Sequence, residues 1–180
     1  MERSSLEAAL DIGCVRGVNA IMLEMNGCDV TGIDLTENAI SDAKAKAVEH
    51  HVNVNFVIGD VLRMDRLFKE SESDVIIDSF LFHTMTEEER PIFARQVYKV
   101  LKPGGKYFML CFSDKDSAGP GPRRISKAEI EHTLHRFSKL SAMLRICCKI
   151  EVKFLCITEK IDLPIWNFLP NNFLRFVIVR

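Results

Sequence analysis

The sequence lacks the usual features of secreted and membrane proteins. Its first residues, MERSSLEAALDIGC, carry early acidic side chains and no apolar segment of signal-peptide length. No apolar run elsewhere approaches the length that spans a bilayer. The six cysteines form no CxxC pair, and several lie in apolar, strand-like runs, which favours reduced core thiols over disulfides or a zinc site. We therefore expect a cytoplasmic protein with no membrane partner and no bound metal.

The sequence also lacks an excess of either charge and any internal division. Its 24 Lys and Arg residues are balanced by 25 Asp and Glu residues, so the formal net charge is -1 at pH 7. Without a global basic field we expect no nucleic-acid partner, although a local basic patch stays open. No repeat or low-complexity linker interrupts the 180 residues, of which 47% are hydrophobic. This favours one domain over residues 1–180, with the strongest pattern in 8–114 and a weaker one in 140–180.

Strand-like runs alternate with helical patterns through most of the chain. The apolar runs are AALDI, CDVTGID, VNFVI, SDVIID and KYFMLCF, and two later runs, CKIEVKFLCIT and NFLRFVIV, also look like strands. The alternation predicts an α/β fold with a parallel sheet and helices on both faces. The strands are nearly continuous apolar segments, as expected when both of their faces are covered.

Local signals predict where individual helices begin and end. Thr86 with Glu89 and Ser126 with Glu129 fit capping boxes, in which side chains satisfy the free amides of a helix's first turn. The first box predicts a helix from about Arg90 to Leu101. The segment 102–105, Lys-Pro-Gly-Gly, should end that helix and turn the chain into the KYFMLCF strand.

The segment LDIGCVRGVNAI places two glycines between the first expected strand and the first expected helix. Gly13 and Gly17 would let the backbone approach a ligand closely, and the helix start offers unpaired N–H donors to a carboxylate or phosphate. A dinucleotide motif of the dehydrogenase type, G-x-G-x-x-G, would need glycine at positions 15 and 18, where both residues are valine. The dehydrogenase interpretation therefore loses its main motif.

Three aspartates end or adjoin successive expected strands. Asp34 ends the second strand, where a carboxylate can accept both hydroxyls of a ribose. Asp60 follows the third strand, where it can accept a hydrogen bond from an adenine amino group. Any one aspartate is more often a turn or cap residue. Together with Asp11 in the first strand, however, they place three carboxylates in register at one edge of the sheet.

Five segments resemble, in order, the successive motifs of class I S-adenosylmethionine-dependent methyltransferases: LDIGCVRG, VTGIDL, IGDVL, DVIIDSFLFH and VLKPGGKYFMLCFSD. They cover residues 8–114. Further segments, RGVNAI, DSFLFHTM and the GPRRIS loop, are most similar to the small-molecule branch that includes thiopurine and tellurite-resistance methyltransferases. The resemblance implies a Rossmann-like, doubly wound sheet of seven mostly parallel strands, with the last strand antiparallel. It also implies S-adenosylmethionine as the cofactor.

The resemblance assigns the cofactor contacts residue by residue. Gly13 and Gly17 would form the cofactor loop, Asp11 would hold the amino group of the methionine part, and Asp34 would bind the ribose. The other implied contacts are Asp60 and Val61 at the adenine, Asp78 and Ser79 beside the methyl group, and Cys14, Asn19 and Leu35 along the same loops.

Four residues are candidates for the acceptor side. His83 could act as a base, because an unperturbed histidine titrates near neutral pH, or it could serve packing or capping. Phe82, together with Phe80 and Leu81 before it, could form an apolar acceptor pocket or cover the sheet. Arg123 and Arg124 could anchor an acidic acceptor, or form solvated surface.

Two departures from the family pattern define the alternatives for function. Val15 replaces the middle glycine of the D-x-G-x-G-x-G pattern, so we expect weakened rather than abolished cofactor binding. Few residues precede the first strand, so we expect an open pocket or an incomplete chain. The leading hypothesis is transfer of a methyl group to a small-molecule acceptor by direct displacement, which needs chiefly alignment of the reacting groups. The alternative is a cofactor-binding but inactive, truncated or degenerate homologue.

Overall fold

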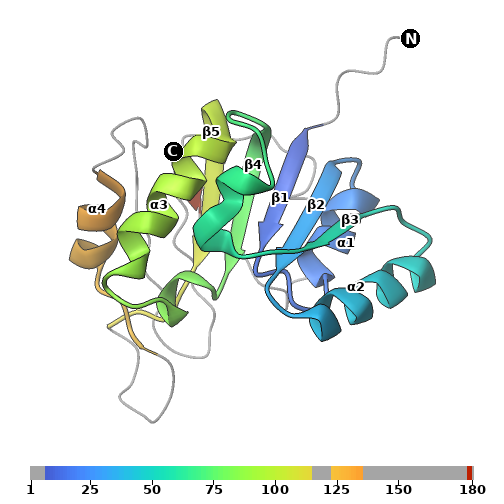
Figure 1. Ribbon diagram of the computed structural model, residues 1–180, viewed down its shortest axis with the longest axis horizontal. Coiled ribbons are helices and arrows are strands. Elements are labelled where there is room, and N and C mark those ends of the chain that lie inside the picture. The colour runs from blue at the N-terminus through green and yellow to red at the C-terminus, as the bar shows by residue number, and fades with distance from the viewer. Residues whose placement is uncertain (1–6, 115–122, 136–177, 180) are drawn as a thin grey trace.

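The computed structural model describes residues 7–114, 123–135 and 178–179. These residues contain a six-stranded sheet with the order β3-β2-β1-β4-β5-β6 (Figure 1). The first five strands are parallel and the last is antiparallel to β5. The strands are β1 (Ala8–Ile12), β2 (Asp29–Asp34), β3 (Asn55–Ile58), β4 (Ser73–Ser79), β5 (Leu101–Leu110) and β6 (Ile178–Val179).

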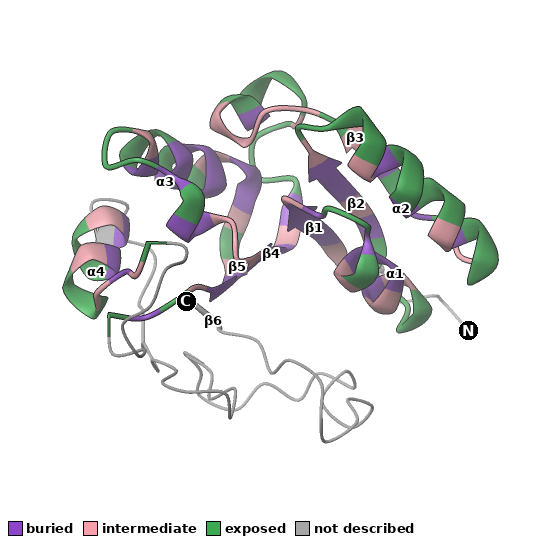
Figure 2. Cartoon of the chain, turned by 90° about the horizontal axis from the view of Figure 1, so that it is seen from below, coloured by how far each residue is buried: buried purple, intermediate pink, exposed green. Residues whose placement is uncertain are grey.

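Helices cover both faces of the sheet. Seen from below, α1 (Val18–Met25) and α2 (Glu37–Glu49) lie on one face, and α3 (Glu89–Val100) with α4 (Lys127–His135) on the other (Figure 2). Two short 3-10 helices, η1 (Val61–Arg66) and η2 (Phe82–Thr84), follow β3 and β4. The prediction of a Rossmann-like, doubly wound α/β fold is confirmed.

Alternate residues of each strand supply two separate hydrophobic cores. Leu10 and Ile76 belong to the core under α3 and α4, whereas Ala9, Val75 and Ile77 belong to the core under α1 and α2. Side chains of successive strand residues point to opposite faces, so both sets must be apolar. This two-sided burial explains why the strands are continuous apolar runs in the sequence.

The predicted helix boundaries are met closely. At the start of α3, the Glu89 carboxylate accepts from the Thr86 N–H at 2.8 Å, and the Thr86 hydroxyl accepts from the Glu89 N–H at 3.3 Å. Ser126 and Glu129 form the same reciprocal pair before α4, at 2.8 Å and 3.2 Å. Both capping boxes are therefore confirmed.

The segment 102–105 lies inside β5 and not in a turn between helix and strand. The strand begins at Leu101, directly after α3, and its pairing moves from Ser73↔Leu101 to Val75↔Lys106. Four residues of β5 thus fit between two pairs that β4 separates by one residue, which is a large bulge. Gly104, with φ +81°, supplies the left-handed backbone that this excursion needs.

The predicted seven strands are met only in part. Six strands lie within the described residues, and the last of them is antiparallel, as expected. The run CKIEVKFLCIT and most of NFLRFVIV lie outside the described residues, with only Ile178–Val179 of the second run placed, in β6. That residues 1–180 form one domain stays a prediction. Among the described helices, none combines the length and the apolar character that crossing a bilayer requires.

Candidate functional site

The parallel strands end at one edge of the sheet, here called the carboxyl edge. The strand order reverses between β1 and β4, and in open α/β sheets ligands bind in the crevice at such a reversal. The glycine turn, residues 13–17, leaves β1 at this edge, and the segment 80–83 leaves β4 beside it. The predicted site residues on β1, β2 and β4 therefore come together at one place in the fold.

The glycine turn has left-handed backbone at three positions. Gly13, Val15 and Gly17 have φ values of +64°, +46° and +69°. A Cβ atom on Gly17 would lie 2.6 Å from Cζ of Phe56 and 2.9 Å from Cβ of Ala43, so glycine is needed there for packing as well as for backbone conformation. At Gly13 a Cβ atom would lie 3.1 Å from a methyl group of Leu81. At Gly13 and Gly17 the atoms nearest to an added Cβ thus belong to protein side chains, and the close approach of a ligand to this backbone stays a prediction.

Asp11 lies fully buried beneath the start of α1. Its Oδ2 accepts a hydrogen bond from the Ala20 N–H at 3.1 Å and so caps the first turn of α1 from outside the helix, where Gly17 has no side chain to do so. Its Oδ1 is buried and has no hydrogen-bond partner. Burial raises the pKa of Asp11 to about 7, although the hydrogen bond from the Ala20 N–H and the side chain of the half-buried Asn19 lower it. A cationic donor would satisfy this oxygen and stabilise the ionised form.

Asp34 anchors the glycine turn to the end of β2. Its Oδ2 accepts from the Val15 N–H at 3.0 Å, and its Oδ1 accepts from the Thr36 N–H at 3.0 Å and the Thr36 hydroxyl at 2.9 Å. The Val15 side chain is 56% exposed, and the neighbouring Leu35 is 70% exposed. The carboxylate therefore occupies a fixed position between the turn and open surface.

Asp60 caps the short helix η1 after β3. Its Oδ1 accepts from the Leu62 N–H at 2.8 Å, and its Oδ2 lies 3.7 Å from Nε of Arg63. Asp60 and the following Val61 are half-buried, on the β3 side of the carboxyl edge. The cap accounts for the aspartate by itself, and contact with an adenine stays a prediction.

Asp78 is fully buried and organises the segment that follows β4. Its Oδ2 accepts from the Tyr107 hydroxyl at 2.7 Å, and its Oδ1 accepts from the Leu81 N–H at 2.8 Å and the Phe82 N–H at 3.3 Å. Burial raises the pKa of Asp78 to about 6, although these donors lower it. The side chain thus positions neighbouring residues, Ser79 is half-buried, and contact of either residue with a ligand stays a prediction.

Three rings, here called the aromatic cluster, meet at the ends of β4 and β5: Phe80, His83 and Phe112. The ring centroids of Phe80 and Phe112 are 5.1 Å apart. The ring centroid of His83 lies 5.7 Å from that of Phe80 and 5.1 Å from that of Phe112. His83 is buried, its Nδ1 has no hydrogen-bond partner, and burial lowers its pKa. Beside the cluster lies a cavity of about 410 Å³ lined by residues 83–88 and Arg123.

Of the four predicted acceptor residues, His83 and Arg123 line this cavity, whereas Phe82 and Arg124 do not. Phe82 is fully buried in the core, with its ring 6.1 Å from that of Phe93 and the guanidinium of Arg90 over its face at 5.5 Å. Its place in the core argues against contact with an acceptor and favours the alternative that it covers the sheet. Arg123 is at the cavity, but its Nη2 donates to Glu87 at 2.8 Å and to Glu129 at 3.0 Å. Arg124 is half-buried and does not line that cavity.

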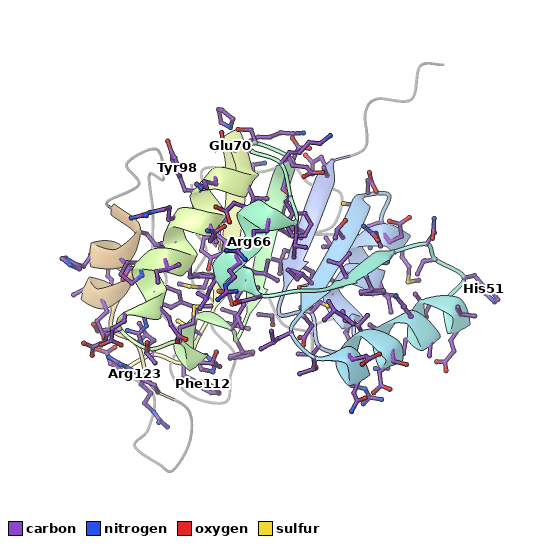
Figure 3. All side chains as sticks on the ribbon, viewed as in Figure 1. His51, Arg66, Glu70, Tyr98, Phe112 and Arg123 are labelled. Atoms are coloured by element: carbon purple, nitrogen blue, oxygen red, sulfur yellow. The ribbon has the colours of Figure 1, made fainter. Side chains whose placement is uncertain are left out.

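The cluster lies far from the opposite edge of the sheet. Phe112 and Arg123 lie at the lower end of the molecule in Figure 3, and Glu70 and Tyr98 at the upper end. A smaller cavity, of about 260 Å³, is lined at the upper end by residues that include Glu70, Tyr98 and Gly104. Within the described residues, no three or more His, Cys, Asp and Glu side chains gather as a metal site.

Sequence patterns single out only part of this edge. The run Phe80, Leu81 and Phe82 is a candidate for an apolar acceptor pocket or a cover for the sheet, whereas Tyr107 and Phe112 lie in or beside a strand and are indistinguishable from core residues by type. The one available signal is position, because Phe80 and Phe112 follow the ends of two neighbouring parallel strands.

The fold and the carboxyl edge together define the class of protein. A doubly wound sheet that reverses its order between β1 and β4, with a glycine turn and carboxylates at the reversal, is the Rossmann-like architecture. Residues 9–105, more than half of the chain, match the family described as "Methyltransferase domain". The chain belongs to this family, the class I S-adenosylmethionine-dependent methyltransferases.

Proteins similar in sequence to this chain are methyltransferases named for different acceptors. Over 132 residues the chain is 31% identical to the 2-heptyl-1-hydroxyquinolin-4(1H)-one methyltransferase of Mycobacteroides abscessus, a match that covers 71% of this chain and 57% of that protein. Over 143 residues it is 32% identical to phosphoethanolamine N-methyltransferase 3 of Arabidopsis thaliana, covering 77% of this chain and 28% of that one. The chain thus spans about half the length of the first relative and less of the second.

Solved structures agree on the fold. A SAM-dependent methyltransferase from Methanosarcina mazei superposes with a TM-score of 0.66 at 20% identity, covering 74% of this chain and 80% of that one. TehB from Haemophilus influenzae superposes with a TM-score of 0.60 at 22% identity, covering 72% and 45%. These identities support a shared fold, and placement of the chain near the thiopurine and tellurite-resistance branch stays a prediction.

Proposed function

We propose that this chain transfers a methyl group from S-adenosylmethionine to a small-molecule acceptor by direct displacement. The observation that carries the proposal is the buried carboxylate of Asp11: its Oδ2 caps the first turn of α1, and its Oδ1 has no hydrogen-bond partner among the described residues. A buried carboxylate oxygen without a partner costs free energy, and an amino group donated by a ligand would offset that cost. The methionine part of the cofactor carries such a group.

The residues present at the carboxyl edge fit this cofactor. Asp11 would hold the amino group, and Asp34, already fixed by Val15 and Thr36, would accept from the ribose hydroxyls. Asp60 and Val61 would border the adenine, and Cys14, Asn19, Leu35, Asp78 and Ser79 stay predicted neighbours. When bound, the cofactor supplies a methyl group already activated by a positively charged sulfur. The chain itself must align an acceptor and exclude water, which needs neither a metal nor a catalytic triad.

The alternative is a cofactor-binding but inactive homologue, and Val15 bears on the affinity of the binding step. Val15, where the family pattern has glycine, holds a strained φ of +46° with its side chain 56% exposed at the mouth of the turn. A β-branched side chain there would crowd a ligand that lies along the turn. The hydrogen bond from Val15 to Asp34 nevertheless keeps the turn in place, which favours weakened binding over lost binding.

The names of the relatives include one heterocyclic N-hydroxyl acceptor and one amine acceptor, so they support a small-molecule acceptor without fixing its class. A cytoplasmic location, the absence of a nucleic-acid partner and the absence of a membrane partner stay predictions.

Isothermal titration of the chain with S-adenosylmethionine and S-adenosylhomocysteine tests the proposal, with a nicotinamide dinucleotide as the control. We expect micromolar binding of both sulfur compounds and none of the dinucleotide. Binding followed by transfer of labelled methyl to an acceptor distinguishes the enzyme from the inactive homologue. A folded chain that binds neither compound would contradict the proposal, and preference for the dinucleotide would revive the dehydrogenase interpretation.

A further inference from the structure

We infer that the methyl acceptor is an uncharged, planar aromatic molecule with a hydroxyl group, bound against Phe80 and Phe112, and that His83 accepts the hydroxyl proton. This inference rests on the proposed function and narrows it to one class of acceptor. Three properties of the β4 and β5 ends carry it: the two ring surfaces, the charge around the cavity and the state of the histidine.

Phe80 is held in an unfavourable backbone conformation that presents its ring beside Phe112. Its φ of +67° is rare for a residue with a bulky side chain and is energetically unfavourable. The conformation persists because the Phe80 N–H donates to the Leu110 carbonyl at 2.8 Å, while Asp78 accepts from the next N–H, of Leu81, at 2.8 Å. Strain of this kind is concentrated at binding sites, where the geometry serves a ligand.

Both rings present apolar surface that the described residues leave partly uncovered. Phe112 is 36% exposed and Phe80 is half-buried, and their centroids are 5.1 Å apart in a tilted arrangement. Partly exposed aromatic faces at a strand end suit a flat ring, which gains stacking in addition to area burial. The neighbouring hollow of about 410 Å³, which is open to solvent and is lined by His83 but not by Phe80 or Phe112, has a volume in the range of small-molecule sites.

The charges around the cavity disfavour an anionic acceptor. Glu87, Glu88 and Arg123 line it, and both Glu87 and Glu129 accept hydrogen bonds from Arg123. Arg123 is thus offset by carboxylates, and the charged side chains among the described lining residues sum to one negative charge. A phosphate or carboxylate entering here would meet repulsion and find no uncommitted cation among those lining residues.

His83 is suited to take a proton from such an acceptor. It lines the cavity, its ring packs edge-on against both phenylalanines, and its Nδ1 has no partner. Burial lowers its pKa, so the imidazole is neutral at pH 7 and has a nitrogen that can accept. In the transfer, the acceptor oxygen bonds to the methyl carbon as the carbon–sulfur bond breaks. The sulfonium becomes a neutral thioether, and the hydroxyl proton passes to His83 and then to solvent.

Ligand titration of the chain saturated with S-adenosylhomocysteine tests the acceptor class. Naphthol is the neutral probe, hydroxynaphthoate is the same ring system with a carboxylate, and phosphoethanolamine is the non-aromatic probe. We expect naphthol to bind about tenfold more tightly than hydroxynaphthoate, and phosphoethanolamine not to bind. Phe112→Leu should weaken naphthol about fivefold. The matched control is Tyr98→Leu, which removes a partly exposed aromatic ring at the opposite edge and should change nothing (Figure 3).

Turnover separates the role of His83 from simple packing. With S-adenosylmethionine and naphthol, His83→Asn should lower kcat about 100-fold and leave KM within about twofold. Equal effects of Phe112→Leu and Tyr98→Leu, tighter binding of hydroxynaphthoate, or a His83→Asn loss confined to KM would overturn the inference. Methylation of phosphoethanolamine alone would overturn it and leave the proposed function standing. Failure of S-adenosylhomocysteine to bind would overturn both.

Discussion

The two halves of the carboxyl edge are built by different means. At the ends of β1, β2 and β3 the site consists of backbone conformation and carboxylates: the glycine turn, Asp11, Asp34 and Asp60. At the ends of β4 and β5 it consists of ring contacts among Phe80, His83 and Phe112. In the proposed function the first half binds the polar groups of the cofactor, whereas the second half presents the ring surfaces of this chain to the acceptor. Variants should therefore affect one half without the other.

The largest effect is expected at Gly17, on the cofactor half. In Gly17→Ala the new Cβ would lie 2.6 Å from Phe56 Cζ at a φ of +69°, so strain and crowding should lower the free energy of unfolding by about 3 kcal/mol. The matched control is Gly27→Ala, at φ +87° with no atom within 4 Å of the new Cβ, where only about 1 kcal/mol is expected. Chemical denaturation measures both, and equal losses would contradict the packing argument.

Asp34→Ala should weaken cofactor binding by about 1–3 kcal/mol, because it removes a charged acceptor from the ribose and frees the Val15 N–H. Asp29→Ala, at the other end of β2, is the control and should bind as the unmodified chain does. Isothermal titration gives both affinities. An unchanged affinity in Asp34→Ala would remove the ribose assignment.

Asp11→Asn should separate stability from binding. The folded pKa of about 7 lies above 3.8, the ordinary value for an aspartate, so the native chain retains the proton that the unfolded chain loses. Stability should therefore fall as pH rises between those two values, and the penalty should be complete above about 7. Asparagine removes the titration, so Asp11→Asn should be the more stable chain by about 1–2 kcal/mol near pH 8, with a smaller difference near pH 5.

Thermal unfolding of both Asp11 forms across this range checks the sign. A stability gain that shrinks as pH rises would contradict the account. The same variant should bind S-adenosylmethionine more weakly, because a neutral amide pairs less strongly with an ammonium group.

Val15→Gly, in the cofactor half, should raise the free energy of unfolding by a smaller amount. The change removes the backbone strain of a β-branched residue at φ +46°, which stabilises the folded chain. Glycine has more conformational freedom in the unfolded chain, which offsets part of this gain, so we expect about 1 kcal/mol of net stabilisation. Cofactor affinity should rise with it. A loss of stability on denaturation would show that the Val15 side chain packs usefully in the turn.

The smallest effect is expected from Arg90→Met, beneath the acceptor half. Arg90 is 3% exposed, its Nε and Nη2 have no partners, and its one ion pair, with Glu129, is long at 3.4 Å. Replacing a buried, poorly paired charge with an apolar side chain of similar length should change the free energy of unfolding by less than about 1 kcal/mol, in either direction. Denaturant titration would contradict this if the loss exceeded about 3 kcal/mol.

The same contrast explains what could be predicted from the sequence. The capping pair of Thr86 and Glu89 and the turn at Asp34 and Thr36 depend on neighbours in the chain, so local patterns reveal them. The strands follow from two-sided burial, which leaves a continuous apolar run. The sequence also indicated that Gly13 and Gly17 sit in a turn, although the crowding by Phe56 and Leu81 was not visible.

Contacts between distant residues decided the rest. Tyr107 bonds to Asp78 across 29 positions, and Arg123 bonds to Glu87 across 36, so no local pattern showed that Asp78 is enclosed or that Arg123 is offset by carboxylates. Phe82 and Phe80 differ by two positions and look alike in the sequence. The turn held by Asp78 sends Phe82 into the core and leaves Phe80 half-buried at the edge.

Amide chemical-shift mapping of the full chain tests the division of the carboxyl edge most directly. S-adenosylhomocysteine should shift the amides of residues 13–20, 34–36 and 60–62, and later addition of naphthol should shift those of residues 80–88 and 112–114. That sequential and largely separate response is the result expected from two independently built halves. The account would be contradicted if S-adenosylhomocysteine shifted mainly residues 80–88 and 112–114, or the opposite edge around residues 98–105.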